Sequence, residues 1–297
     1  AGGDFTSWIM NQNPRPKRPI VFSGYSGKEQ PLPGWTTSTY PYCKRLEGEL
    51  FDGRIVIAQD FDPEVNKCSL VLGRVPAHRL QAWTAATRGT YDDIQKWWVE
   101  KWKHGYRIVH LSGGATGFAA FMMKCFAKMQ QTWHGDTDSF SEWCDRYWRE
   151  GYRITSVSPG HGQKWLLVMS QCVSHYLYGD YDAGTQGIQR WRTRSTWSDV
   201  EAQIEEGWDD GYIITGLEHS QGSYLLVMTK SSRDQEYWWG DDYGNFPDMR
   251  EAWADGKDIT VMFKDPTDGC WLAVGTGGVN AEAACYHTDI LATSSDQ

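Results

Sequence analysis

The residues best placed to do chemistry in this chain are acidic pairs that recur in short turns. The pairs are Asp92 and Asp93, Asp136 and Asp138, Asp180 and Asp182, and Asp241 and Asp242. Oxygen-rich turns of this kind can coordinate calcium. The alternative is helix capping, because Asp and Ser just before a helix accept hydrogen bonds from its free N–H groups. None of the turns matches the EF-hand spacing, so the sequence favours capping and predicts no metal site.

A basic, aromatic segment, IQRWRTRSTW, is the main candidate for a binding surface. It combines three arginines with two tryptophans: Arg190, Trp191, Arg192, Arg194 and Trp197. Arg and Trp dominate binding hot spots, and these arginines stand out in an acidic chain. We interpret 184–196 as an insertion of about fourteen residues, from the wider spacing of the sequence repeat there. The alternative is a solvated loop whose Trp packs onto the body of the protein.

A second contact candidate lies near the start of the chain. The segment PRPKRP, residues 14–19, carries Arg15, Lys17 and Arg18. Its proline content is typical of an extended arm. We therefore predict that this arm contributes to partner binding.

The signatures of common catalytic sites are missing from the sequence. It has no HExxH, GxSxG, SxxK or kinase motif, and GTGGVN at 275–280 lacks the lysine of a P-loop. Ser158 and His161 share a loop but make no triad, and the seven Cys include no CxxC pair. We therefore predict a non-enzymatic protein with no cofactor. Paired turn carboxylates leave a glycosidase-type hydrolase as the weakest alternative.

These residues are positioned by a unit that recurs along the chain. In its clearest copy Phe140, Trp143 and Tyr147 share one helix face, Gly151 ends the helix, and two apolar strands follow over 152–157 and 165–169. The glycines that end the predicted helices are Gly53, Gly105, Gly151, Gly211 and Gly256. Their separations of roughly 52, 46, 60 and 45 residues indicate a repeat architecture.

Each unit is followed by a further segment that is typical of a third short strand. The segments are 79–83, 129–133, 175–178 and 235–239. The sequence thus predicts an α+β fold with five repeats of a helix plus an antiparallel β-hairpin, or three strands. Stacked neighbours can bury the faces that one unit leaves exposed.

Two parts of the chain are distinguished by this pattern. Residues 1–42 form an N-terminal arm with a closing strand at 20–25, which we predict to pair with the last repeat. Residues 43–297 form a single repeat domain. Its repeats are predicted at about 43–88, 89–135, 136–182, 183–240 and 241–287.

Composition limits the classes of partner. The net charge of −9 argues against nucleic acid, which requires a basic face. No apolar run approaches the ~20 residues of a membrane span, although peripheral association with a membrane complex is compatible with the sequence. The 17 Trp fall mostly at repeat positions, so we interpret most of them as core residues. The start at Ala1 fits a processed mature protein of an organelle or secretory compartment, or a trimmed chain; the compartment is unknown.

The repeated motif resembles a known one. W-x-x-G-[YF]-x-I-T-S followed by W-x-x-V-M-S, present as WREGYRITSVSPGHGQKWLLVMS and WDDGYIITGLEHSQGSYLLVMT, is similar to the repeat region C-terminal to the kinase domain of plant casein-kinase-1-like proteins. Similar units occur in the non-catalytic half-barrel domain of polyglycine hydrolases. The likeness covers about 91–275 and includes no catalytic domain. It implies a non-catalytic array, arranged as a curved half-barrel or a closed propeller-like ring.

Repeat arrays present broad surfaces to partners. We therefore expect a protein-interaction or scaffold module, an accessory or structural subunit of a larger assembly whose partners are other protein subunits. The alternative is a carbohydrate- or small-ligand-binding, lectin-like module, which an exposed row of Trp would favour. A cleft holding two carboxylates would favour the hydrolase.

Overall fold

The computed structural model describes residues 20–22, 54–62, 67–74, 82–114, 117–124, 130–135, 140–160, 165–171, 188–220, 222–240, 255, 257–265 and 270–277. Within these ranges the chain is a mixed α and β protein with three helices and fifteen strands. The mixed class predicted from the sequence is therefore confirmed. No helix among the described residues combines the length and apolar character needed to cross a membrane.

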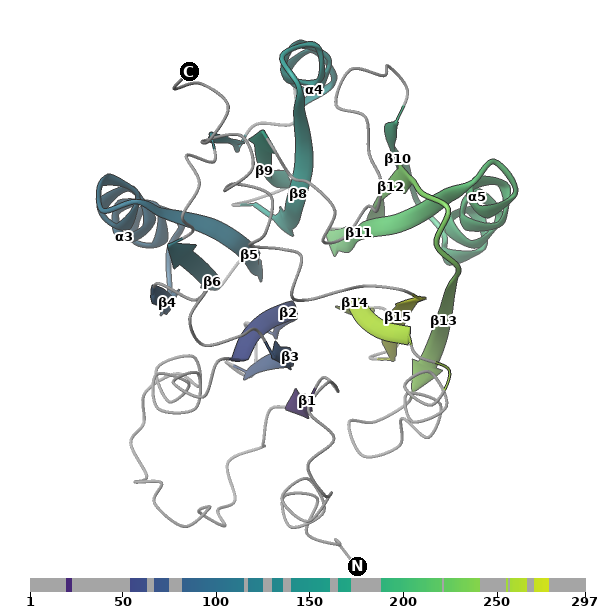
Figure 1. The fold of residues 1–297 in the computed structure, drawn as a ribbon, viewed down its shortest axis with the longest axis horizontal. Helices are drawn as coiled ribbons and strands as arrows, with labels where there is room; N and C mark the ends of the chain where they lie inside the picture. The colour runs from purple at the N-terminus through teal and green to yellow at the C-terminus, as the bar shows by residue number, and fades with distance from the viewer. Residues whose placement is uncertain are drawn as a thin grey trace, which may run out of the picture.

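The strands form five three-stranded antiparallel sheets (Figure 1). Sheet 1 contains β1 (Ile20–Phe22), β2 (Arg54–Asp62) and β3 (Lys67–Arg74). Sheet 2 contains β4 (Ala82–Arg88), β5 (Tyr106–Gly114) and β6 (Gly117–Lys124). Sheet 3 contains β7 (Gln131–His134), β8 (Tyr152–Pro159) and β9 (Trp165–Gln171). Sheet 4 contains β10 (Gln189–Arg194), β11 (Tyr212–Ser220) and β12 (Ser223–Lys230). Sheet 5 contains β13 (Gln235–Gly240), β14 (Lys257–Lys264) and β15 (Trp271–Gly277).

All five sheets have the same internal order. The last strand in the chain lies in the middle, between the first and the second. The second strands lie nearest the centre of Figure 1 and are called inner strands here; the first strands are called outer strands. Each inner strand contacts the next: β2 with β5, β5 with β8, β8 with β11, β11 with β14, and β14 with β2.

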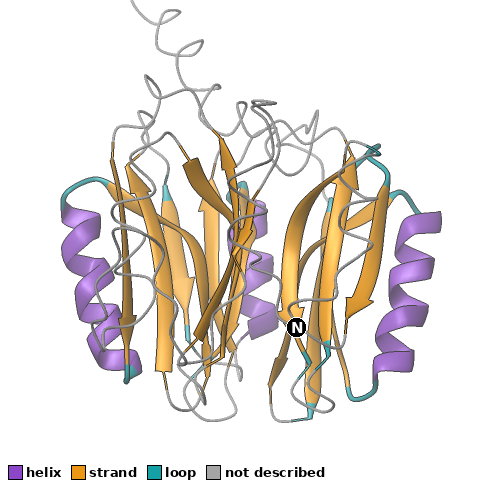
Figure 2. Cartoon of the chain, turned by 90° about the horizontal axis from the view of Figure 1, so that it is seen from below, coloured by secondary structure: helices purple, strands orange, loops and turns teal. Residues whose placement is uncertain are grey.

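The helices α3 (Tyr91–Lys103), α4 (Phe140–Arg149) and α5 (Trp197–Asp209) connect the outer and inner strands of sheets 2, 3 and 4. They run alongside the strands at the periphery of the molecule (Figure 2). At the start of α3 the Thr90 hydroxyl accepts the Asp93 N–H at 3.2 Å, which assigns this acidic turn to capping. The helices are followed by Gly105, Gly151 and Gly211, whose φ values of 86°, 84° and 76° confirm the predicted glycine stops.

The core lies between consecutive sheets. Ile94 and Trp98 of α3 are completely buried and pack in one cluster with Leu166 and Val168 of the next sheet. The alternate residues of β9, such as Leu167, face the cluster around α4 instead. A middle strand is thus buried on both faces, which explains its continuous apolar sequence. Burying each such side chain stabilises the fold by about 1.5–3 kcal/mol.

The segments predicted as third strands do form strands at 82–88, 131–134 and 235–240, but each pairs with the hairpin that follows it. The segment β7, for example, pairs with β9 of sheet 3 because α4 returns the chain to that sheet. Segment 175–178 lies outside the described residues. The division of the chain into 1–42 and 43–297 stays a prediction.

The closing strand was assigned the wrong partner. Residues Ile20–Phe22 do form a strand, but it pairs with β3 rather than with the last repeat. The reason is topological: β1 takes the outer place of sheet 1, as β4 does in sheet 2. Part of the segment 184–196, interpreted as an insertion, is a regular element, since Gln189–Arg194 forms β10 against β12, whereas residues 184–187 lie outside the described residues.

Candidate functional site

The most regular polar feature of the described residues is a glutamine at the start of three outer strands: Gln131, Gln189 and Gln235. The side chain of each reaches the inner strand of the preceding sheet, where it contacts both backbone groups of one isoleucine. The isoleucines are Ile108, Ile154 and Ile214. Their N–H groups donate to the glutamine Oε1 at 2.8, 2.7 and 2.6 Å, and their carbonyls accept from Nε2 at 2.7, 3.0 and 2.9 Å. We call this contact the glutamine bridge.

The bridge supplies hydrogen-bond partners to a strand edge that the sheet topology leaves unpaired. An inner strand is paired on one side only, so its other edge carries unpaired N–H and C=O groups that need partners. At the junction of sheets 3 and 4, Gln189 is buried, and its Oε1 also accepts the Trp148 indole N–H at 3.2 Å. Its Nε2 donates a second bond to the Thr229 hydroxyl at 3.0 Å. All four hydrogen-bonding positions of the amide are used.

The sequence motif is explained by these contacts. Its Trp and Ile are the glutamine partners, as in Trp148 and Ile154. Its Thr bonds a hydroxyl of the middle strand, as Thr155 does with Ser170 at 2.9 Å. The sequence analysis did not identify the glutamines. The signal that could have found them is a Gln two residues before an aromatic residue in each of the three segments.

The two tryptophans of the predicted binding segment are packing residues in the structure. Trp191 packs edge-on against Phe140 of α4, with ring centroids 4.4 Å apart. Trp197 begins α5 and packs against Trp239 of sheet 5 at 4.5 Å. Both are half-buried, and each connects neighbouring sheets.

The three arginines of that segment do lie together, because alternate residues of a strand share a face. Arg190 pairs with Asp210 at 3.2 Å, and its guanidinium lies 4.3 Å from the Tyr212 ring. Arg194 donates to Gln203 of α5 at 2.8 Å. Arg192 lies between them, is exposed, and donates to the carbonyl of Trp191 at 2.9 Å. Arg192 is thus the member of the set that presents its charge to solvent.

The other predicted site residues lie outside the described residues. They are Arg15, Lys17 and Arg18 of the arm, and Asp136, Asp138, Asp180, Asp182, Asp241 and Asp242 of the turns. Their roles stay predictions. Among the residues that the structure does describe, no group of three or more His, Cys, Asp and Glu is arranged to hold a metal ion.

Cys144 and Ser158, which could in principle act as nucleophiles, are both buried. Burial, with a smaller contribution from Asp145, raises the pKa of the Cys144 thiol to about 12. The thiol is therefore protonated at neutral pH and a poor nucleophile. Ser158 is also buried and donates to the carbonyl of Pro159 at 3.1 Å, whereas His161 lies outside the described residues.

One buried polar contact joins sheets 4 and 5, and a second lies within sheet 5. The Tyr224 hydroxyl donates to Asp265 at 2.5 Å, and the His219 ring lies 4.6 Å from the Tyr224 ring. Burial lowers the pKa of His219, and this outweighs the opposite effect of the Asp265 charge. Lys257 is buried beside Glu236 at 2.7 Å and Asp234 at 3.3 Å. Burial acts to lower the pKa of Lys257, but the bonds to these two carboxylates outweigh it and raise the pKa.

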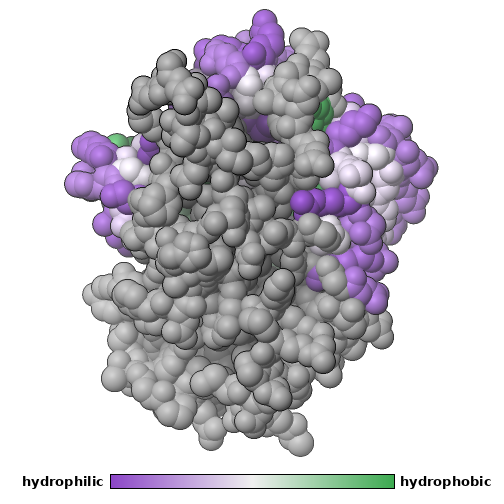
Figure 3. All heavy atoms as spheres, in the orientation of Figure 1, coloured by the Kyte–Doolittle hydropathy of each residue, from purple (hydrophilic) through white to green (hydrophobic). Residues whose placement is uncertain are grey.

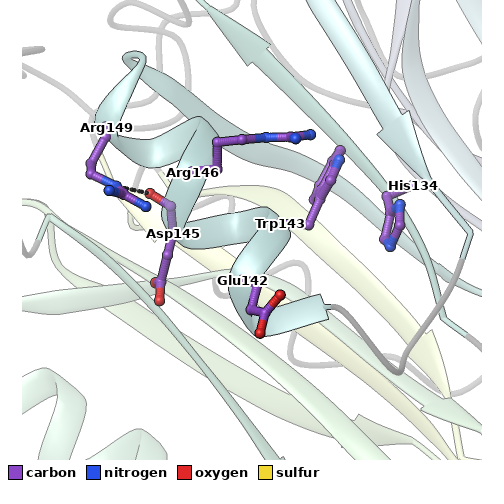
Figure 4. Close-up of a pocket in the computed structure, with 6 residues that line it drawn as sticks. All are labelled: His134, Glu142, Trp143, Asp145, Arg146 and Arg149. Atoms are coloured by element: carbon purple, nitrogen blue, oxygen red, sulfur yellow. Dashed lines mark hydrogen bonds between the residues drawn. The ribbon is translucent and has the colours of Figure 1, made fainter.

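The described residues line two hollows of very different size. A cavity of about 50 Å³ lies among β5, β8, β11 and β14 and has room for water only. A hollow of about 660 Å³ opens to solvent beside β7 and α4 (Figure 4). Its described lining is His134, Glu142, Trp143, Asp145, Arg146 and Arg149. Its volume is within the range of small-molecule sites.

Comparison with known proteins gives a family match over part of the chain and no activity. Residues 81–193 match the model of a family described as a domain of unknown function, DUF7477. The match begins just before β4, spans sheets 2 and 3, and ends within β10, which is less than half of the chain. A search of curated proteins finds no match.

Proposed function

We propose that this chain is a non-enzymatic protein-interaction or scaffold module, built as a closed, propeller-like ring of five repeats. The observation that carries the proposal is the cyclic contact of the inner strands, including β14 with β2, in sheets of identical internal order. The glutamine bridges at three of the junctions support the same reading. The resemblance to the repeat region of plant casein-kinase-1-like proteins is part of this proposal.

A rigid ring presents its periphery to partners. The exposed side chains of α3, α4 and α5 are mainly hydrophilic (Figure 3), which fits a polar, readily reversible interface better than an obligate apolar one. Arg192 is the residue of the predicted binding segment that we propose to contact a partner, because it is exposed next to a fixed Trp. The partners we expect are other protein subunits of a larger assembly.

The lectin-like alternative based on exposed Trp gains no support from the described residues. Every Trp whose side chain the structure describes is buried or half-buried. The tryptophans pack between neighbouring sheets, as Trp98 and Trp191 do.

The test is the native mass of the protein in its source extract, with mass spectrometry of co-eluting chains. Elution in a complex well above the 33.9 kDa of the chain, with reproducible partners, is expected. Arg192→Glu should then release partners, whereas Lys96→Glu, an equal charge reversal at an exposed site of α3, should not. Trp191 is unsuitable for this test because its replacement would disturb the core. Elution as a lone chain would refute the scaffold assignment.

A further inference from the structure

The hollow beside β7 and α4 gathers four charged side chains of one helix around a concave surface. On α3, Glu100 pairs with Lys103 and His104, and at the end of α5 Asp210 pairs with Arg190. On α4, the four charged residues that line the hollow form no ion pair with any described residue. They are Glu142, Asp145, Arg146 and Arg149. Their hydrogen-bonding capacity is therefore available to a ligand.

Flat side chains stand next to these charges. The His134 ring is stacked on Trp143, with centroids 4.9 Å apart and planes 18° from parallel. Trp143 in turn contacts Tyr147, and the Arg146 guanidinium lies 4.7 Å from the Tyr147 ring. Trp143 is buried at 7% exposure, so it fixes the imidazole in place. Figure 4 shows His134, Trp143 and Arg146 in one row along the hollow.

The neighbouring sheet offers an internal comparison. His134 pairs with Leu167 in sheet 3 as Arg192 pairs with Leu226 in sheet 4. Trp143 lies five residues before the bridge tryptophan Trp148, and in sheet 4 the residue five before Trp208 is Gln203. The same framework thus carries a stacked aromatic pair in sheet 3 and polar residues in sheet 4. The framework itself does not require the aromatic pair.

We propose that this hollow binds a neutral saccharide. Two carboxylates and two guanidinium groups give the described lining a charge near zero, which selects against strongly anionic or cationic ligands. Adjacent acceptors and planar donors suit the paired hydroxyl groups of a sugar ring. The negative face of the stacked aromatic pair suits the ring's C–H groups. This site is independent of the scaffold assignment, since a partner-binding ring can carry it or lack it.

The role of each residue follows from its position. The imidazole of His134 forms the platform, and the carboxylates of Glu142 and Asp145 accept hydroxyl hydrogen bonds. Arg149 is oriented by donation from its Nε to the Asp145 carbonyl at 3.0 Å, which leaves its terminal nitrogens as donors. Arg146 is oriented by the contact of its guanidinium with the face of the Tyr147 ring.

The test is binding of the full chain to an array of neutral and acidic oligosaccharides, of both polysaccharide and protein-glycan type. A hit is then titrated by saturation-transfer NMR. We expect neutral sugars to bind. Comparison of the polysaccharide fragments with the protein glycans shows whether the natural ligand is a polysaccharide or a glycoprotein. His134→Ala and Glu142→Gln should each weaken the hit about tenfold, the effect of one lost charged hydrogen bond or aromatic contact. Glu142 is exposed, so Glu142→Gln should leave the melting temperature unchanged, whereas His134 is half-buried and stacked on Trp143, so His134→Ala is compared at a temperature at which circular dichroism shows it folded.

The matched control is Glu205→Gln, on the exposed face of α5 at the position equivalent to Asp145, which should bind as the unchanged protein does. Three results would overturn the assignment: no neutral sugar binds at millimolar concentration, only acidic sugars bind, or binding survives both His134→Ala and Glu142→Gln. None of these results depends on whether the protein elutes alone or in a complex.

Discussion

Replacing Gln189 with Leu tests whether the glutamine bridges hold neighbouring sheets together. Leucine has a similar size but removes four hydrogen bonds, among them the two that Gln189 makes with the buried N–H and C=O of Ile154. Each buried unsatisfied group costs about 1–3 kcal/mol. Thr229 keeps its bond to Thr215 at 2.9 Å, and Trp148 is half-buried, so their losses are smaller. We expect the free energy of unfolding to fall by about 4 kcal/mol.

The measurement is equilibrium urea unfolding, together with hydrogen exchange of the Ile154 amide. The amide should lose protection in the variant because its acceptor is gone. The control is Gln203→Leu on the surface of α5, which loses contacts to Arg194 and Glu206 and should cost less than about 0.5 kcal/mol. A Gln189→Leu protein within about 1 kcal/mol of the unchanged one would refute the reasoning. So would an Ile154 amide that exchanges at its original rate.

Three further predictions follow from buried groups. Trp98→Phe should lower stability in thermal unfolding only through the smaller ring, by about 1 kcal/mol, because the buried Nε1–H of Trp98 has no partner among the described residues, whereas Trp148→Phe also removes a hydrogen bond to a glutamine. Glu236→Gln should lower the melting temperature at neutral pH, and the difference from the parent should shrink above pH 10, because the raised pKa of Lys257 contributes stability that is present below its unfolded pKa and is lost as pH rises through the folded pKa; thermal melts at pH 7 and above pH 10 measure this. Cys144 should resist alkylation by iodoacetamide at pH 7.5 until the protein unfolds, because its thiol is fully buried and its pKa is raised to about 12. Peptide mapping measures the alkylation, and rapid modification of the native protein would contradict this prediction.

The local parts of the fold were predictable because they depend on local sequence. A glycine just past a helical stripe requires a positive φ, and Gly105, Gly151 and Gly211 have one. The partner of a strand depends on the path of the chain between strands instead. The hairpin after β7 and the hairpin before it have the same sequence pattern, so the sequence could not say that β7 joins β9. The same limit explains the wrong partner assigned to Ile20–Phe22.

The candidate site was less predictable from the sequence, because it depends on side-chain contacts between separate helices and strands. The sequence shows Arg190 and Arg194 as free charges, but Asp210 and Gln203 of the same unit bind them. Conversely, His134 and Trp143 are nine residues apart and carry no motif. Only the packing of α4 beside β7 stacks their rings.

The glutamine bridges identified among the described residues join sheets 2 to 5, and this should determine where the proposed ring opens. In sheet 2 the position equivalent to Gln189 is Trp83, which pairs with Met123 as Gln189 pairs with Thr229. In sheet 1 the outer strand begins at Ile20, one residue after the position that corresponds to Gln189. The residue at that position is Pro19, whose side chain has no amide group. At both junctions of sheet 1 the sequence therefore places no glutamine at the bridge position. Because local opening follows the least-bonded unit, amides of β2 and β3 should exchange before those of β8 and β9. Equal exchange in the two sheets would mean that apolar packing, rather than the bridges, determines the order of opening.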